Sequence, residues 1–209
     1  MADLLEIPVH LKTDRQIIHV DMDAFYAQVE IRDNPALANV PLILAHDPRK
    51  NGGRGVVATA NYVARKLGVH SAMSAAEALR LAPNATFLDP NFEKYRAVSQ
   101  QVHDIFQRYT DKVEPIAFDE AYLDVTENKT GHTNAVALAH ELQQTIFAEL
   151  SLTSSVGISF NKFLAKLSSE HNKPVGLTVV READIRAFLD ALPIEDVRGV
   201  GQKTAIKMH

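Results

Sequence analysis

The sequence predicts an α+β protein built on a split β-α-β-β-α-β sheet. A strand rich in β-branched residues, 16–22, opens the pattern and ends in charge. From residue 91 onward the order is helix, strand, strand, helix, strand. One strand followed by that order is typical of a ferredoxin-like antiparallel sheet. The residues between the first strand and residue 91 therefore form an insertion.

Each element of the sheet has its own signal. The stretch 91–109 is expected to be an amphipathic helix, because its apolar residues recur on one side. The stretch 113–126 indicates two strands around the charged pair Asp119 and Glu120. The remaining expected elements are a helix over 133–150, a strand over 153–160, a helix over 161–170 and a short apolar run at 176–180.

The insertion carries short elements and a polar, glycine-rich loop at 47–55. Asn61 or Thr59 is expected to cap one of its helices, and Ser74 another. The expected elements are a helix from Ala24 to about Asn34, strands over 40–46 and 55–62, and helices over 61–68 and 74–83.

The composition excludes some classes of function. The 209 residues are 46% hydrophobic, which is ordinary for a globular protein, and include no cysteine. Disulfides, thiolate zinc sites and cysteine nucleophiles are therefore excluded. We find no signal peptide and no apolar run of membrane-spanning length, so a cytoplasmic protein without a membrane partner is expected.

The charge balance argues mildly against a nucleic-acid partner. The net charge is −4, whereas proteins that bind phosphate backbones usually present a basic face. The basic residues are grouped, however, so a binding surface could be locally positive. The groups are Arg49, Lys50 and Arg54; Arg65 and Lys66; Lys162 and Lys166; and Lys203 and Lys207.

Three carboxylates are expected to converge in the split sheet. The first strand and the following hairpin lie side by side at the sheet centre, so Asp21 can meet Asp119 and Glu120. Like charges this close raise each other's pKa unless a cation neutralises them. Oxygen ligands of this kind suit Mg²⁺. The alternative is that these acids are simply solvated, but apolar residues flank both stretches. Asp23, on the same strand face as Asp21, could be a metal ligand or a structural hydrogen-bond acceptor, and the second role is favoured. Asp124 is expected to be structural.

A second group of residues could hold phosphate oxygens. Tyr62 and Arg65 lie three positions apart on a predicted helix and so share one face. A guanidinium suits bidentate phosphate contact, and Lys162 could add a point charge near the sheet. The alternative is a core tyrosine beside two solvated cations.

The sequence resembles the Y-family of translesion DNA polymerases, in its bacterial DNA polymerase IV type. Five stretches carry the resemblance in the expected order and spacing, and they span most of the chain from about 16 to 207. They are "HVDMDAFYAQVE", "GVVATANYVARKLGV", "VEPIAFDEAYLDVT", "GISFNKFLAKLSSEHNKPVGLTVV" and "VRGVGQKTA".

The resemblance implies a division into domains and a reaction. It implies a palm at 1–24 and 91–169, fingers at 25–90, and a partial thumb with a helix-hairpin-helix element at 170–209. It also implies error-prone, lesion-bypassing DNA synthesis without proofreading, from deoxynucleoside triphosphates on primer-template DNA. The family's C-terminal little-finger domain and clamp-binding segment are expected to be absent here, so the chain alone should bind DNA weakly and a sliding clamp would bind through the absent part.

The resemblance also implies roles for individual residues. Asp21, Asp119 and Glu120 would be catalytic and would hold two Mg²⁺ ions with the backbone carbonyl of Met22. Tyr26 would be a steric gate against ribonucleotides. The further implied nucleotide-binding residues are Phe25, Thr59, Tyr62, Arg65 and Lys162, and the implied DNA-binding residues are Gly199, Gly201 and Lys203.

Two other functions compete with this interpretation. A nucleotide cyclase of the diguanylate type could share the split sheet and the carboxylate-bound Mg²⁺, but the sequence has no turn like "GGDEF". A non-catalytic DNA-binding or clamp-regulating module could have kept the fold. Such a module would be expected to lose its catalytic residues, whereas the implied site residues are all present: Asp21, Asp119, Glu120, Tyr62, Arg65 and Lys162.

Overall fold

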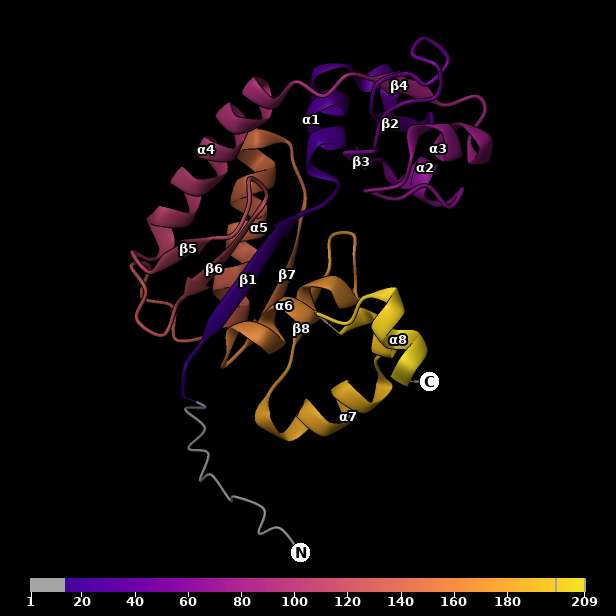
Figure 1. The fold of residues 1–209 in the computed structure, drawn as a ribbon. Helices are drawn as coiled ribbons and strands as arrows, with labels where there is room; N and C mark the ends of the chain where they lie inside the picture. The colour runs from indigo at the N-terminus through magenta and orange to yellow at the C-terminus, as the bar shows by residue number, and fades with distance from the viewer. Residues whose placement is uncertain (1–13, 198, 209) are drawn as a thin grey trace, which may run out of the picture.

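The computed structural model describes residues 14–197 and 199–208, apart from the side chain of Gln202. Its larger sheet has five strands in the order β5-β6-β1-β7-β8 (Figure 1). Their bounds are β1 Ile17–Met22, β5 Val113–Pro115, β6 Glu120–Asp124, β7 Ser154–Ser159 and β8 Leu177–Val179.

The predicted split arrangement is confirmed. β1 lies at the centre and pairs antiparallel with β6 on one side and with β7 on the other. β5 continues the sheet as the antiparallel neighbour of β6. β8, the apolar run at 176–180, adds a parallel strand beside β7. The register places Asp21 opposite Glu120, so the two predicted ligands meet at the carboxyl end of β1.

Alternation along β1 divides its side chains between two helical layers. Ile18, Val20 and Met22 lie in the main core with α4, Phe92–Tyr109, and α5, Ala135–Leu150. On the other face Ile17 packs on Ala165 of α6, Lys162–His171. His19 and Asp21 therefore also face α6. The buried polar side chains of His19 and Asp21 therefore lie under α6, with Asp21 near the carboxyl end of β1.

A smaller unit follows β1 and lies beside the carboxyl end of the larger sheet (Figure 1). Its three-stranded sheet has the order β3-β2-β4. The sequence predicted β2 but not β4, and it predicted too long a strand around β3. The bounds are β2 Leu42–Leu44, β3 Thr59–Ala60, β4 Thr86–Leu88, α2 Tyr62–Arg65, α3 Ala75–Leu81 and the 3₁₀ turn Pro35–Leu37.

The first helix, α1, Phe25–Asp33, joins the two units. Phe25 and Val29 pack in the main core, whereas Ala27 packs with Leu42 and Leu44 of the smaller unit. The helix begins one residue later than predicted, because Ala24 adopts a left-handed conformation with φ 42°. This turn lets the chain leave β1 and enter α1 abruptly.

The last part of the described chain forms a group of short helices beyond β8, which packs on Phe160, Leu164 and Val180 (Figure 1). These are two 3₁₀ turns, Glu182–Asp184 and Ile194–Asp196, and the helices α7, Ile185–Ala191, and α8, Gln202–Met208. The predicted division at 169/170 falls inside α6, and β8 belongs to the larger sheet. We therefore propose that this third unit begins after Val180.

Among the described residues, no helix has both the length and the apolar character needed to cross a lipid bilayer.

Candidate active site

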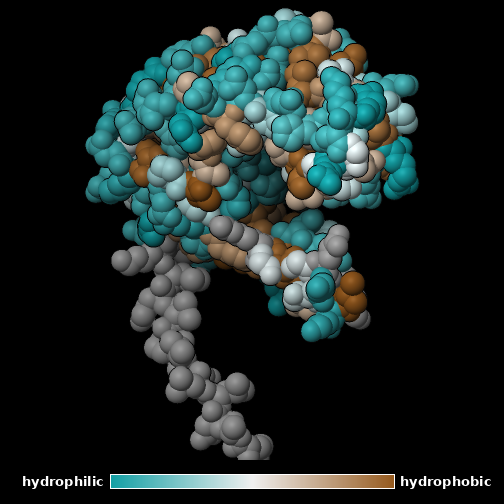
Figure 2. Space-filling model, turned by 45° about the horizontal axis from the view of Figure 1, so that its top comes forward, coloured by the Kyte–Doolittle hydropathy of each residue, from teal (hydrophilic) through white to brown (hydrophobic). Residues whose placement is uncertain are grey.

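A polar pocket of about 410 Å³ opens at the carboxyl end of β1, where the smaller unit faces the larger sheet. Figure 2 shows the surface hollowed between the two units. All of the predicted catalytic and nucleotide-binding residues except Lys162 line this pocket. The pocket is also lined by Ala24 and Ala58, and by four residues that were not among the predicted site residues, Ser71, Lys166, Glu170 and Lys173.

The three predicted acids of the pocket come from β1, from the β5–β6 turn and from the first residue of β6, and a fourth acid, Glu170, comes from α6. The amide of Met22 donates a hydrogen bond of 2.9 Å to the carbonyl of Asp119, which fixes the turn against the strand. Burial raises the pKa of Asp21 to about 7, against the opposing effect of Lys173. Burial also raises the pKa of Asp119. In both residues burial disfavours the charged carboxylate, and a bound cation would oppose that effect.

Met22 offers only its backbone to the pocket. Its side chain is 1% exposed and packs in the main core. The carbonyl is thus the group through which Met22 could serve as a metal ligand, as the resemblance implies.

Two lysines pair with the acids of the pocket. The ammonium of Lys173 lies 2.8 Å from Asp21 Oδ2 and 3.0 Å from Glu170 Oε2. The ammonium of Lys166 pairs with Glu120 Oε2. The His19 imidazole and Lys166 together hold the pKa of Glu120 at about 2. The positions of these ammonium groups indicate where a divalent cation would be favoured.

Asp23 is a structural residue, as predicted. It is 1% exposed, and its carboxylate accepts hydrogen bonds from Thr153 Oγ1, Ser155 Oγ and the amide of Val175. These three bonds tie the end of β1 to β7 and to the loop that carries Lys173. Asp124 is likewise structural, since it pairs with Arg15 and accepts bonds from Thr126.

The smaller unit supplies the opposite wall of the pocket. The guanidinium of Arg65 donates to the carbonyl of Ala60 at 2.9 Å and to Thr59 Oγ1 at 3.2 Å. It also lies over the Tyr62 ring, 5.4 Å from the centroid. Burial raises the pKa of Tyr62 to about 12, so its hydroxyl stays a hydrogen-bond donor. Arg65 is thereby held in one orientation beside the acids.

Tyr26 is fixed by other aromatic rings. Its ring stacks on Tyr95 with centroids 4.4 Å apart and meets the edge of Phe92 at 5.8 Å. The Tyr95 hydroxyl donates to Glu30 at 2.7 Å, so the supporting ring is itself held. A ring supported in this way can exclude a substituent by its volume. Phe25, by contrast, is a core residue at 2% exposed.

The structure does not bring Lys162 to the pocket, which corrects its predicted position. Its ammonium pairs with Glu114 and lies 5.6 Å from the centroid of the Tyr122 ring. The reason is the direction of α6, which follows β7 and so runs parallel to β1. The first residue of the helix lies near the amino end of β1. Lys166 and Lys173 lie progressively closer to the carboxyl end.

Several pocket residues had weak signals in the sequence. Lys173 stands in a polar loop before a proline, "HNKPVG", and its acidic partner Asp21 is distant in the chain. Lys166 and Glu170 occupy successive turns of α6, a spacing that would place them on one helical face. That spacing was the available signal, whereas the position of Lys173 depends on packing.

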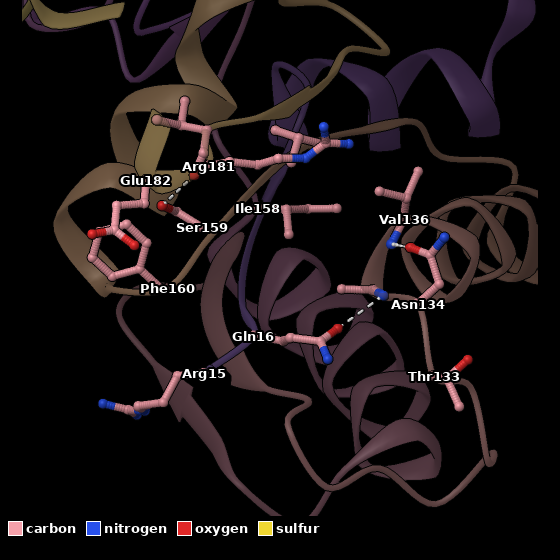
Figure 3. Close-up of a pocket in the computed structure, with 13 residues that line it drawn as sticks. Arg15, Gln16, Thr133, Asn134, Val136, Ile158, Ser159, Phe160, Arg181 and Glu182 are labelled. Atoms are coloured by element: carbon pink, nitrogen blue, oxygen red, sulfur yellow. Dashed lines mark hydrogen bonds between the residues drawn. The ribbon is translucent and has the colours of Figure 1, made fainter. Parts of the chain in front are cut away.

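A larger cavity, of about 620 Å³, lies at the other end of the sheet. Figure 3 shows that some of its polar groups bond to neighbouring residues that also line the cavity. Ser159 Oγ donates to the carbonyl of Val180, and Gln16 Oε1 accepts from the amide of Ala135. It lacks the converging acids of the first pocket, so we assign it no chemistry.

The predicted helix-hairpin-helix turn lies in the third unit. Gly199 has φ 95°, a conformation that favours glycine, and the carbonyl of Gly201 accepts from the amides of Thr204 and Ala205 at the start of α8. Lys203 is exposed. The turn therefore presents backbone and one cation to solvent.

Comparison with known proteins identifies the family. Residues 20–170, which carry all of the pocket acids, match the impB/mucB/samB family. The chain belongs to this family. Its members are the Y-family polymerases, and the similar proteins agree. DNA polymerase IV of Streptococcus thermophilus is 55% identical over 206 residues, covering 99% of this chain and 56% of the relative. DNA polymerase IV of Streptococcus pyogenes serotype M1 is also 55% identical, covering 99% of this chain and 57% of that relative.

Solved Y-family structures share the fold. DinB from Sulfolobus solfataricus superposes with a TM-score of 0.84 at 37% identity, covering 92% of this chain and 56% of that one. A structure described as an insertion ternary complex of Dbh DNA polymerase gives 0.83 at 37% identity, with the same coverage of both chains. The present chain thus spans little more than half the length of the proteins it matches. The α+β fold with a split sheet is confirmed as that of the Y-family.

Proposed function

We propose that this chain is the catalytic core of an error-prone, lesion-bypassing DNA polymerase. It would add deoxynucleotides to a primer 3′-hydroxyl under the direction of a template, without proofreading. The observation that carries the proposal is the pocket itself, in which acids at the end of β1 face Arg65 and Tyr62 across a space of about 410 Å³. Membership of the Y-family supports the same reading.

The donor set suits two Mg²⁺ ions, held by Asp21, Asp119, Glu120 and the carbonyl of Met22. All four groups offer oxygen, and the Lys166 and Lys173 ammonium groups already mark the places where positive charge is favoured. When bound, the ions would increase the acidity of the primer hydroxyl and stabilise charge on the leaving pyrophosphate.

The cations of the pocket would bind the triphosphate. Arg65 comes from the smaller unit and Lys173 from the larger, so the two would hold phosphate oxygens from opposite walls. Lys173 takes the role that the sequence assigned to Lys162. Once its carboxylate partner has another cation, Lys173 is free to turn to the nucleotide. Nucleotidyl transfer needs positioning and electrostatic stabilisation more than a side-chain nucleophile.

Tyr26 would select the sugar. Its ring is supported by Tyr95 and Phe92, so it would resist displacement by a ribose 2′-hydroxyl. Small residues around the pocket, such as Ala58, would leave room for an altered template base.

The exposed turn with Gly199, Gly201 and Lys203 would contact a phosphate of the primer-template through backbone amides. Contact with a sliding clamp stays a prediction from the resemblance.

The test is primer extension with this chain, a recessed primer-template, single deoxynucleotides and Mg²⁺ at low salt. We expect addition that follows the template and is lost in an Asp119→Ala, Glu120→Ala double variant. Addition independent of the template or undiminished in that variant would contradict the proposal. Silence of the wild-type chain, even after fusion to the C-terminal half of a DNA polymerase IV, would also overturn it.

A further inference from the structure

A strained turn follows Lys173 in the loop between α6 and β8. Val175 has φ 58°, in the left-handed region that β-branched residues rarely adopt. Burial of Val175 does not offset that strain, because the residue is 60% exposed. Other contacts must therefore stabilise the turn, and strained backbone that is held in this way is concentrated at functional sites.

Two buried polar side chains hold the turn. Asp23 is 1% exposed and Ser155 is 0% exposed. Asp23 Oδ2 accepts a hydrogen bond of 3.0 Å from the amide of Val175. Ser155 Oγ accepts one of 3.2 Å from the amide of Gly176 and donates one of 2.7 Å to Asp23 Oδ1. One carboxylate thus holds two consecutive amides, the first directly and the second through a hydroxyl.

Asp23 is itself fixed to the sheet. Its amide donates to the carbonyl of Thr153 at 3.0 Å, and Thr153 Oγ1 donates to Asp23 Oδ2 at 2.8 Å. These bonds join Asp23 to the residue before β7, at the point where the chain leaves β1. The turn at Val175 is therefore held against the same strand end that carries Asp21.

The turn separates a fixed residue from a residue of the pocket. On one side, the carbonyl of Gly176 accepts a hydrogen bond of 2.9 Å from the amide of Val156 in β7. On the other side, the ammonium of Lys173 lies 2.8 Å from Asp21 Oδ2. The backbone conformation of Val175 therefore sets the direction in which Lys173 enters the pocket.

We propose that Asp23 and Ser155 are positioning residues, which hold the strained turn at Val175 and so direct Lys173 toward the triphosphate. This role rests on the proposed function, in which Lys173 leaves Asp21 when a metal ion binds there. The ion pair of Lys173 with Asp21 is then lost. The hydrogen bonds of the turn do not involve that pair, so they remain and keep the backbone of Lys173 in place.

The test is single-nucleotide insertion by Ser155→Ala, Lys173→Ala and the double variant. Ser155→Ala should lower kcat/KM for deoxynucleotides at least about tenfold, mainly through KM, because a misplaced binding group loses much of its effect. In the Lys173→Ala background the same substitution should cost less than about twofold, since the cation that it positions is gone. A residue that only stabilises the fold would give additive losses, and that result would overturn the proposal.

Thr153→Val is the matched control. It removes another hydrogen bond of the Asp23 carboxylate, but not one that reaches the turn. Its kcat/KM should stay within about twofold of wild type even where its free energy of unfolding falls. Equal losses of kcat/KM in Thr153→Val and Ser155→Ala would contradict a positioning role.

Val175→Gly tests the strain itself. Glycine adopts a positive φ without the clash of a Cβ, so the turn then needs less support. Added to Ser155→Ala, this substitution should recover at least about threefold of the lost kcat/KM. No recovery would mean that Ser155 does not act through the turn, and the proposal would be wrong.

Amide hydrogen exchange tests the turn without catalysis and without a variant that must fold. In the wild-type chain the Val175 amide should exchange at least about 100-fold more slowly than in an unstructured peptide, although Val175 is exposed. In Ser155→Ala the Gly176 amide should exchange at least about tenfold faster, with the Val180 amide, which bonds to Ile158, as internal control. Fast exchange of the Val175 amide in the wild type would overturn the proposal.

The two proposals fail separately. A wild-type chain that extends no primer, even when fused to the C-terminal half of a DNA polymerase IV, overturns the proposed function. A chain that extends primers but shows additive losses in the double variant keeps the proposed function and overturns the positioning role of Ser155 and Asp23.

Discussion

The role of each residue in the pocket depends on which partner packing brings to it. Lys162 and Lys173 belong to the same stretch of sequence, yet Lys162 pairs with Glu114 and Lys173 with Asp21. The side chain of Lys173 is 20% exposed and that of Lys162 is 46% exposed. A charge in the less exposed place interacts more strongly, because solvent screens it less.

This difference predicts unequal effects of the same substitution. Lys173→Ala should lower kcat/KM for deoxynucleotides by about 10- to 100-fold, since a charge-assisted phosphate contact contributes about 1.5–3 kcal/mol. Lys162→Ala, the matched control, should stay within about twofold of wild type, as expected for an exposed pair. Steady-state kinetics of single-nucleotide insertion measure both. A larger loss of kcat/KM in Lys162→Ala than in Lys173→Ala would instead support the nucleotide-binding role that the resemblance implied for Lys162.

Tyr26 gives a second prediction at this scale. Tyr26→Ala should lower the preference for deoxynucleotides over ribonucleotides by at least about tenfold, because the volume that excludes the 2′-hydroxyl is removed. Tyr26→Phe keeps the ring and its stacking on Tyr95, and so should keep the preference. Insertion of paired deoxy- and ribonucleotides opposite one template base provides the measurement. Unchanged discrimination in Tyr26→Ala would exclude a steric gate.

At the scale of elements, the contact of α6 with β7 positions most of the new pocket residues. Gly157 of β7 lets the helix approach closely, since an added Cβ would lie 1.9 Å from the carbonyl oxygen of Ala165. Lys166, Glu170 and Lys173 all follow that point of contact. The placement of these three residues around the acids therefore depends on Gly157, a position without a side chain.

We expect Gly157→Ala to destabilise the fold by at least about 2 kcal/mol, because backbone atoms of α6 would have to move. Gly201→Ala, where an added Cβ meets nothing within 4 Å, is the control and should change the free energy of unfolding by less than about 0.5 kcal/mol. Urea denaturation followed by circular dichroism measures both. A neutral Gly157→Ala would mean that α6 can shift without cost.

At the scale of the whole molecule, the pocket lies between two units with largely separate cores. The main core surrounds α4, α5 and the larger sheet, and a second core lies within the smaller unit. Helix α1 is the element that packs on both sides. A ligand bound in the pocket would contact both units and so connect them a second time.

Nucleotide binding should therefore stabilise the molecule only when both walls are intact. A deoxynucleoside triphosphate with Mg²⁺ should raise the Tm of the wild-type chain. Arg65→Ala on one wall and Lys173→Ala on the other should each remove most of the increase, and the double variant should lose little more. Differential scanning fluorimetry with Lys162→Ala as control tests this. Additive losses would indicate that the two walls bind independently.

The elements that the sequence predicted well are those whose signal is local. Helices α4 and α5 lie within two residues of their predicted ranges, because their apolar period extends over many turns. The three residues of β4 were missed, since a strand this short shows no alternation. The meeting of Asp21 with Glu120 was predictable from the order of elements, because that order fixes which strands are neighbours.

The sequence by itself determined the split sheet, the acids at its centre and the family, since these follow from residue order and spacing. Only the tertiary structure decided which cations reach the acids and that His19 lies beneath them. The physical reason is that charge interactions depend on distance after packing. The packing of α6 on the sheet brings Lys173 to Asp21 and leaves Lys162 beside Glu114, and both pairs join residues that are too far apart in the chain for a local sequence pattern to encode.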